Sequence, residues 1–134
     1  MRLKWITAVG ALLSLAAIAG AQAQAFPSRP VRILVNTAPG GLVDVSARLV
    51  AQKMSEQLGQ PVIVENRPGA DGLLGIRAVK AAPADGYTLL ATSNTIVLLP
   101  AGRNDTGYDP TRDFAGVGPL IRLPSCWWRL PACR

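Results

Sequence analysis

The sequence contains no histidine, so the most common general base and the most common metal ligand of proteins are missing. It also lacks the Gly-x-Ser-x-Gly motif of hydrolases, the lysine motif of phosphate-binding loops and the Gly-x-Gly-x-x-Gly of dinucleotide-binding folds. The carboxylates considered for acid–base chemistry are Asp44, Glu65, Asp71 and Asp85, and they form no recognisable pair. Glu65 is expected to end a strand rather than to act as an acid or base. We therefore expect no catalytic residues, no metal site, no cofactor and no enzymatic activity.

Long runs of charge are also missing. The chain carries 14 lysines and arginines against 8 acidic residues, a net charge of +6, but the basic residues are scattered, with no run of five. No aromatic residues are interleaved with them before the C-terminal end. Nucleic-acid-binding proteins usually concentrate positive charge on one face, so we expect no nucleic acid partner. A modest positive field suits an acidic small molecule instead.

No apolar run is long enough to span a membrane. The run from residue 6 to residue 20 is shorter than the about 20 residues that a spanning helix needs. Arg2 and Lys4 precede it and small residues follow at alternate positions, which is typical of a secretory signal peptide. We expect cleavage after Ala23 or Ala25 and a periplasmic protein with a net charge of +4, because Arg2 and Lys4 are removed from the +6 total. A retained N-terminal membrane anchor is the alternative.

The rest of the chain alternates short apolar segments with loops and helical patterns. Strands are predicted at residues 31–35, 62–65 and 87–91, which are apolar and rich in β-branched residues. Helical spacing of apolar residues predicts helices over residues 43–58 and 73–82, ended by Gly59 and Pro83, and an apolar segment at residues 96–99 follows the third strand. Strands that are each followed by a loop and a helix predict an α/β fold with a parallel sheet and right-handed crossovers.

All three loops of such a sheet leave from the carboxyl ends of the strands, where open α/β sheets bind their ligands. The loops supply backbone amides, hydroxyls and carboxamides, which can bind a small anion without transforming it. The predicted ligand-binding residues are Thr37, Gly40, Gly41, Asn66, Gly69, Ala70, Asp71, Gly72, Thr92, Ser93, Asn94 and Thr95. Asp44 either caps the following helix or orients the first loop.

Five motifs carry a resemblance to a known family. They are FPSRPVR from Phe26, PGGLVD from Pro39, GQPVIVENRPGA from Gly59, ADGYTLL from Ala84 and YDPTRDF from Tyr108. In this order and spacing, over residues 26 to about 123, the chain resembles the Bug-type solute-binding receptors of tripartite tricarboxylate transporters. The resemblance implies a periplasmic-binding-protein fold of two α/β lobes, a monomer that closes on a small di- or tricarboxylate or a related organic acid and delivers it to membrane transporter subunits.

The resemblance also implies which loops bind the ligand, namely residues 37–42, 66–72 and 92–95. Two departures from the family pattern lie within them. Asp71 stands where the family commonly has a glycine, and Thr37-Ala38 replaces a pair that more commonly contains an aromatic residue. A carboxylate facing an anionic ligand would lower affinity, so Asp71 either alters the choice of ligand or caps the second helix, and we expect the cap.

Family members are well over twice as long as this chain, so we expect an incomplete fold that lacks the second lobe. The domains are predicted as a signal peptide at residues 1–25, a first lobe at residues 26–115 and the start of the crossover to a second lobe at residues 116–134. Both cysteines, Cys126 and Cys133, and two of the three tryptophans fall in this last segment. A shifted reading frame would explain the change, since codons for Cys-Trp-Trp-Arg read one base earlier can encode an apolar residue followed by Leu-Val-Ala. A disulfide between the two cysteines is the alternative.

Truncation predicts impaired ligand binding, because half of the ligand contacts would be missing. Three other functions stay open. The chain could be a small secreted interaction domain that uses Trp127, Trp128 and the flanking arginines. It could be a non-functional gene fragment, or the α/β nucleotide-binding domain of an enzyme, although the signal peptide and the missing glycine fingerprint argue against the last.

Overall fold

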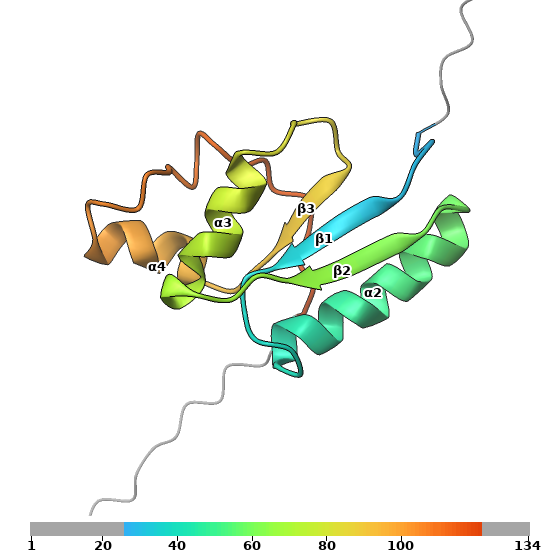
Figure 1. The fold of residues 1–134 in the computed structure, drawn as a ribbon, viewed down its shortest axis with the longest axis horizontal. Helices are drawn as coiled ribbons and strands as arrows, with labels where there is room; N and C mark the ends of the chain where they lie inside the picture. The colour runs from blue at the N-terminus through green and yellow to red at the C-terminus, as the bar shows by residue number, and fades with distance from the viewer. Residues whose placement is uncertain (1–25, 122–134) are drawn as a thin grey trace, which may run out of the picture.

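A computed structural model of the chain describes residues 26–121 (Figure 1). The elements are β1 (Val31–Val35), α2 (Leu42–Leu58), β2 (Val62–Asn66), the short 3-10 helix η2 (Ala70–Gly72), α3 (Leu73–Lys80), β3 (Thr88–Ala91) and α4 (Thr95–Gly102). The predicted strands and the two longer predicted helices are therefore confirmed, with bounds that differ by two residues at most. The predicted signal peptide and the cysteine-containing tail lie outside the described residues.

The three strands form one parallel sheet in the order β2-β1-β3. β1 is the middle strand, and its Ile33 pairs with Val64 on one side and with Leu89 on the other. A middle strand of a parallel sheet is covered on both faces, which explains why the sequence of β1 is nearly continuous in apolar residues. The predicted parallel α/β architecture is confirmed.

α2 packs on one face of the sheet (Figure 1). Its small residues Ala47 and Ala51 lie against Ile33 and Val35 of β1 and Ala91 of β3, and all five are nearly inaccessible to solvent. Alanines on the inner side of the helix let it approach the sheet closely. α2 ends at Gly59, whose left-handed backbone (φ 64°) donates its N–H to the carbonyl of Ser55.

α3 packs on the opposite face of the sheet. Alternate residues of a strand point to opposite sides of a sheet, so each face has its own core. A second core cluster of Leu73, Ile76 and Tyr108 forms there, with Leu90 of β3 and residues of α4 packed against it. Ile76 is completely buried. The connection between β2 and β3 thus crosses β1 on the side that α2 leaves uncovered.

The segment that follows α4 folds back over α3. Arg77 of α3 donates from Nε to the carbonyl of Thr106 at 2.9 Å, and Lys80 forms an ion pair with Asp113 at 2.7 Å. The hydroxyl of Tyr108 donates to the carbonyl of Ile96 at 2.9 Å. These contacts tie residues 103–114 to the lobe.

None of the helices within residues 26–121 has the length and apolar character that crossing a membrane requires.

Candidate functional site

The three predicted binding loops begin at the same edge of the sheet. Val35 at the end of β1 is in register with Asn66 of β2 and with Ala91 of β3. Backbone hydrogen bonds continue this pairing one step beyond β1: the N–H of Asn36 donates to the carbonyl of Ala91 at 3.4 Å, and the N–H of Arg67 donates to the carbonyl of Val35 at 2.8 Å. The end of β1 is therefore the point where the three loops meet.

A buried carboxylate organises the first of these loops. Asp44, in the first turn of α2, is 3% exposed, and its Oδ2 accepts a hydrogen bond from the N–H of Gly40 at 2.8 Å. Its Oδ1 accepts from Asn66 Nδ2 at 2.9 Å and forms an ion pair with Arg48 Nη2 at 3.0 Å. The hydrogen bond from Gly40, followed by those from Arg48 and Asn66, lowers the pKa of Asp44 to about 2. Asp44 is therefore ionised near neutral pH and restrains the loop.

This geometry decides between the two roles considered for Asp44. The N-cap of α2 is Gly41, and no side chain caps it by a hydrogen bond. Asp44 instead bonds the amide of Gly40, a loop residue that precedes the helix. Its local role is to orient the loop, and its charge also lies in the first turn, where the helix dipole favours it.

The second loop is linked to the first through Asn66. The Nδ2 of Asn66 donates to Asp44 and, at 3.3 Å, to the carbonyl of Thr37, while its Oδ1 accepts from Arg48 Nη2 at 2.8 Å. Both polar atoms of this side chain are thus engaged within the lobe. Of the predicted binding residues, Asn66 and the amide of Gly40 already have partners, so their contribution to a site is to position the loops.

The second loop has an unusual backbone. Four consecutive residues have positive φ: Gly69 at 128°, Ala70 at 47°, Asp71 at 58° and Gly72 at 91°. Left-handed conformations are uncommon for residues with a side chain, and aspartate is one of the types that tolerates them. The N–H of Gly72 donates to the carbonyl of Gly69 at 2.9 Å, so this amide is occupied as well.

The predicted cap of the second helix at Asp71 is wrong. The N-cap of α3 is Gly72, and no side chain forms a cap hydrogen bond there. The left-handed backbone of Asp71 lies inside the 3-10 turn that precedes the helix, and its side chain is exposed. Aspartate is favoured at the N-cap of helices, but at this position the backbone forms a turn with positive φ before the helix begins.

The third loop presents hydroxyls on the surface. Ser93 Oγ and Thr95 Oγ1 are 2.8 Å apart, and Thr92 Oγ1 donates a long hydrogen bond of 3.4 Å to the carbonyl of Ser93. Asn94 is the N-cap of α4, again without a side-chain cap hydrogen bond. Within residues 26–121, no side-chain hydrogen bond joins this loop to the other two. It is held beside them by the backbone pairing of β1 and β3.

The sequence interpretation missed Asn36. This residue is 2% exposed, and neither polar atom of its side chain has a hydrogen-bonding partner within the described part of the chain. It packs under the beginning of α3, where a Cβ built on Gly72 would lie 2.4 Å from Asn36 Nδ2. The signal available in the sequence was a carboxamide directly after a buried strand.

Glu65 serves in ion pairs. It is bonded by Arg32 and, at 2.6 Å, by Arg67, and these two arginines lower the pKa of its carboxyl group. Residues 26–121 contain no group of three or more residues that could bind a metal ion.

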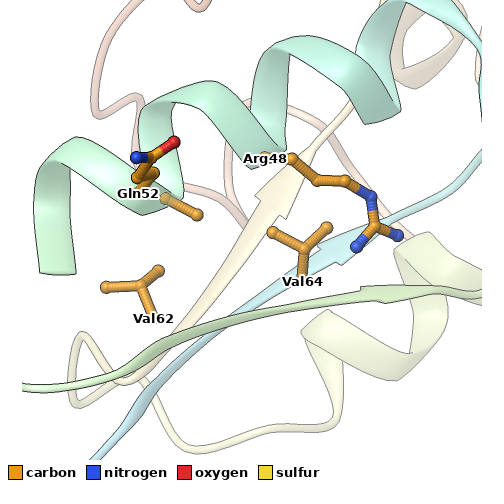
Figure 2. A pocket seen from close by; sticks show the side chains of 5 residues that line it. Arg48, Gln52, Val62 and Val64 are labelled. Carbon is orange, nitrogen blue, oxygen red and sulfur yellow. The ribbon is translucent and has the colours of Figure 1, made fainter.

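Two of the hollows within the described part of the chain lie beside the sheet. The larger, of about 1070 Å³, runs along β3 and the segment from Pro110 to Ile121, and Thr92 and Ser93 are the only predicted binding residues that line it. The smaller, of about 270 Å³, lies between α2 and β2, where Figure 2 shows Arg48 and Gln52 above Val62 and Val64. No predicted binding residue lines the smaller hollow.

Comparisons with known proteins place the chain among transport receptors. A family model described as "Tripartite tricarboxylate transporter family receptor" matches residues 46–130, more than half of the chain. A protein of the UPF0065 group from Bordetella bronchiseptica is 46% identical over 108 residues, which are 80% of this chain and 32% of that protein. Protein BugT of Bordetella pertussis is 42% identical over 94 residues, 69% of this chain and 29% of BugT.

Solved structures agree with the fold. The periplasmic binding protein BugD superposes with a TM-score of 0.63 at 38% identity, over 66% of this chain and 30% of BugD. MatC from Rhodopseudomonas palustris, solved with bound malate, superposes with a TM-score of 0.57 at 37% identity, over 66% of this chain and 31% of MatC. The predicted periplasmic-binding-protein-like lobe is confirmed. The chain spans about a third of the length of the curated relatives it matches.

Proposed function

The chain belongs to the tripartite tricarboxylate transporter receptor family, and from this premise we propose that it provides the first lobe of a periplasmic receptor for a small carboxylate. The family is one of solute-binding receptors rather than enzymes. The lobe would present its ligand to the membrane subunits of a transporter, which are its proposed partners. A secretory signal peptide at residues 1–25 would direct it to the periplasm.

The single observation that carries the proposal is the convergence of three loops at the end of β1. Two helices begin there, at the N-caps Gly41 and Gly72, and neither has a side-chain cap. The unsatisfied amides of a helix N-terminus and its dipole favour a negative charge. The hydroxyls of Thr92 and Ser93 lie on the neighbouring loop. This edge offers hydrogen-bond donors for an anion.

Related proteins supply the ligand class. One similar structure, at 35% identity and a TM-score of 0.57, is a Rhodopseudomonas palustris protein with adipate, and MatC contains malate. Both ligands are dicarboxylates. We infer that a di- or tricarboxylate, or a related organic acid, is the ligand of the receptor that this lobe belongs to.

A titration of the full chain followed by NMR tests the proposal, because amide chemical shifts report even millimolar affinities. Adipate, malate and citrate are the probes. We expect saturable shifts in residues 37–42, 66–72 and 92–95. Replacing Asp44→Asn should weaken binding, since the first loop loses its charged anchor, whereas Glu56→Gln on the exposed side of α2 should not.

Two outcomes would count against the proposal. The absence of any saturable shift at millimolar concentrations of all three acids would overturn it for this chain. Saturable shifts confined to the hollow between α2 and β2 would place the site elsewhere.

A further inference from the structure

The end of β1 holds two polar side chains that have no hydrogen-bonding partner within residues 26–121. Asn36 is 2% exposed, and both its Nδ2 and its Oδ1 are unpaired. The hydroxyl of the next residue, Thr37, is also buried and unpaired. Proteins pair the large majority of their buried polar groups, and an exception needs an explanation. Two adjacent residues with unpaired buried polar groups at the predicted binding edge suit hydrogen bonding to a ligand.

Each of the two side chains faces the beginning of a different helix. A Cβ built on Gly72, the N-cap of α3, would lie 2.4 Å from Asn36 Nδ2. A Cβ built on Gly41, the N-cap of α2, would lie 4.0 Å from Thr37 Oγ1. Both helix starts lack a side-chain cap. At the start of both α2 and α3, backbone amides that favour an anion therefore lie beside an unpaired neutral side chain.

Asn36 is covered by Gly72 and by Gly75 of α3. Gly72 has no side chain, and the turn that leads into it contains Ala70 and Asp71 with positive φ. Backbone held in such sparsely populated conformations is concentrated at ligand clamps and switch regions. A ligand would reach the carboxamide of Asn36 only if this turn and the adjoining start of α3 at Gly75 shifted.

We propose that Asn36 and Thr37 determine which carboxylate binds: an acid that carries a hydroxyl or ammonium group beside its carboxylate binds in preference to the same acid without that group. This inference rests on the proposed carboxylate-binding function. A carboxylate only accepts hydrogen bonds, so it can satisfy the helix amides and Asn36 Nδ2 but leaves Asn36 Oδ1 unpaired. A ligand hydroxyl or ammonium donates to Oδ1, and the Thr37 hydroxyl can donate or accept.

The expected discrimination is large. A site whose buried groups hydrogen-bond to a ligand group rejects the analogue that lacks it, by factors of up to about 10⁴ or 10⁵ in favourable enzymes. We expect a smaller factor in this lobe, because the turn over Asn36 has to shift before a ligand can reach the carboxamide. We expect malate and aspartate to bind at least about tenfold more tightly than succinate, which differs from malate only by one hydroxyl.

The test compares the three acids on the full chain by NMR titration, with Asn36→Leu and Thr37→Val as near-isosteric variants. In both variants the malate-to-succinate preference should fall to within about threefold, because the discriminating hydrogen bonds are lost. Removing an unpaired buried group should also raise the Tm of the ligand-free protein by about 4 °C or more. The control, Asn104→Leu at an exposed position, should change neither the preference nor the Tm.

The outcomes separate this inference from the proposed function. If the wild-type chain binds all three acids with equal affinity, or if both variants keep the wild-type preference, the selection by Asn36 and Thr37 is wrong and the carboxylate receptor stands. If Asn36→Leu lowers the Tm, Asn36 has a structural partner and the inference is again overturned. If the wild-type chain binds none of the acids, the proposed function fails and the inference falls with it.

Discussion

Gly75 brings the backbone of α3 close to the end of β1, and its replacement by alanine tests that packing. A Cβ built on Gly75 would lie 2.9 Å from Asn36 Cβ, 3.0 Å from Asn36 Cα and 3.0 Å from the carbonyl oxygen of Arg67. Two of these three atoms belong to the backbone and the third is attached directly to it, so they cannot rotate away. α3 would have to move off the sheet.

Two opposing effects determine the size of the change. Alanine is favoured over glycine inside a helix by about 0.5–1 kcal/mol. Overpacking a tight contact costs about 1–3 kcal/mol. We therefore expect Gly75→Ala to lower the free energy of unfolding by about 1–2 kcal/mol, because the cost of overpacking exceeds the gain in helix propensity by about this amount.

Gly102 of α4 provides the matched control. It is also helical, and a Cβ built there meets no atom within 4 Å, so only the propensity effect remains. Gly102→Ala should leave stability unchanged or raise it by up to about 1 kcal/mol. For a domain of this size, a difference of about 1 kcal/mol corresponds to about 4–8 °C in Tm. Urea unfolding followed by circular dichroism, with m-values compared among the three proteins, measures both changes. If Gly75→Ala proves as stable as Gly102→Ala, the close packing of α3 on the end of β1 is refuted.

Two further predictions concern the loops. Because the folded-state pKa of Asp44 is lowered from 3.8 to about 2, its ionisation stabilises the fold fully above about pH 4, and this contribution is lost as the pH falls through about 2. The free energies of unfolding of the wild type and Asp44→Asn should therefore converge between about pH 4 and pH 2, and parallel curves would contradict the network of Gly40, Arg48 and Asn66. Asp71→Gly should raise the free energy of unfolding by up to about 1 kcal/mol, because glycine adopts the observed φ of 58° without strain. Thermal unfolding measures this change, and a loss of stability would show that the Asp71 side chain makes a stabilising contact.

The sequence predicted the elements of this lobe well because their signals are local. The β-branched run Val31–Val35, the helical spacing up to Leu58 and the break at Gly59 are each contained in a few residues. The parallel orientation of the strands followed from the alternation of strands and helices, since such crossovers place all loops at one edge. The same reasoning located the loops of the candidate site.

Local patterns could not show which polar groups already have partners. Asn66 is 22 residues from Asp44 in the sequence, and the two meet only because β2 pairs with β1 and α2 lies above both. The burial of Asn36 depends on Gly72 and Gly75 at the start of α3, which follows only after α2 and β2 in the sequence. The failed cap at Asp71 has the same origin, because the tight turn under α3 demands positive φ where propensity alone suggests a cap.

The hydrogen bonds divide the candidate site into two sets of residues with different experimental signatures. The amide of Gly40 and the side chain of Asn66 both donate to Asp44, so replacing Asp44 or Asn66 should weaken all ligands alike by loosening the loops. Asn36 and Thr37 have no such side-chain bonds within residues 26–121, and their replacement should change the ranking of ligands while the fold becomes more stable. A loss of affinity alone therefore does not identify a ligand contact in this lobe. Only a change in preference between acids that differ by a single donor does so, because a structural residue has no means of distinguishing them.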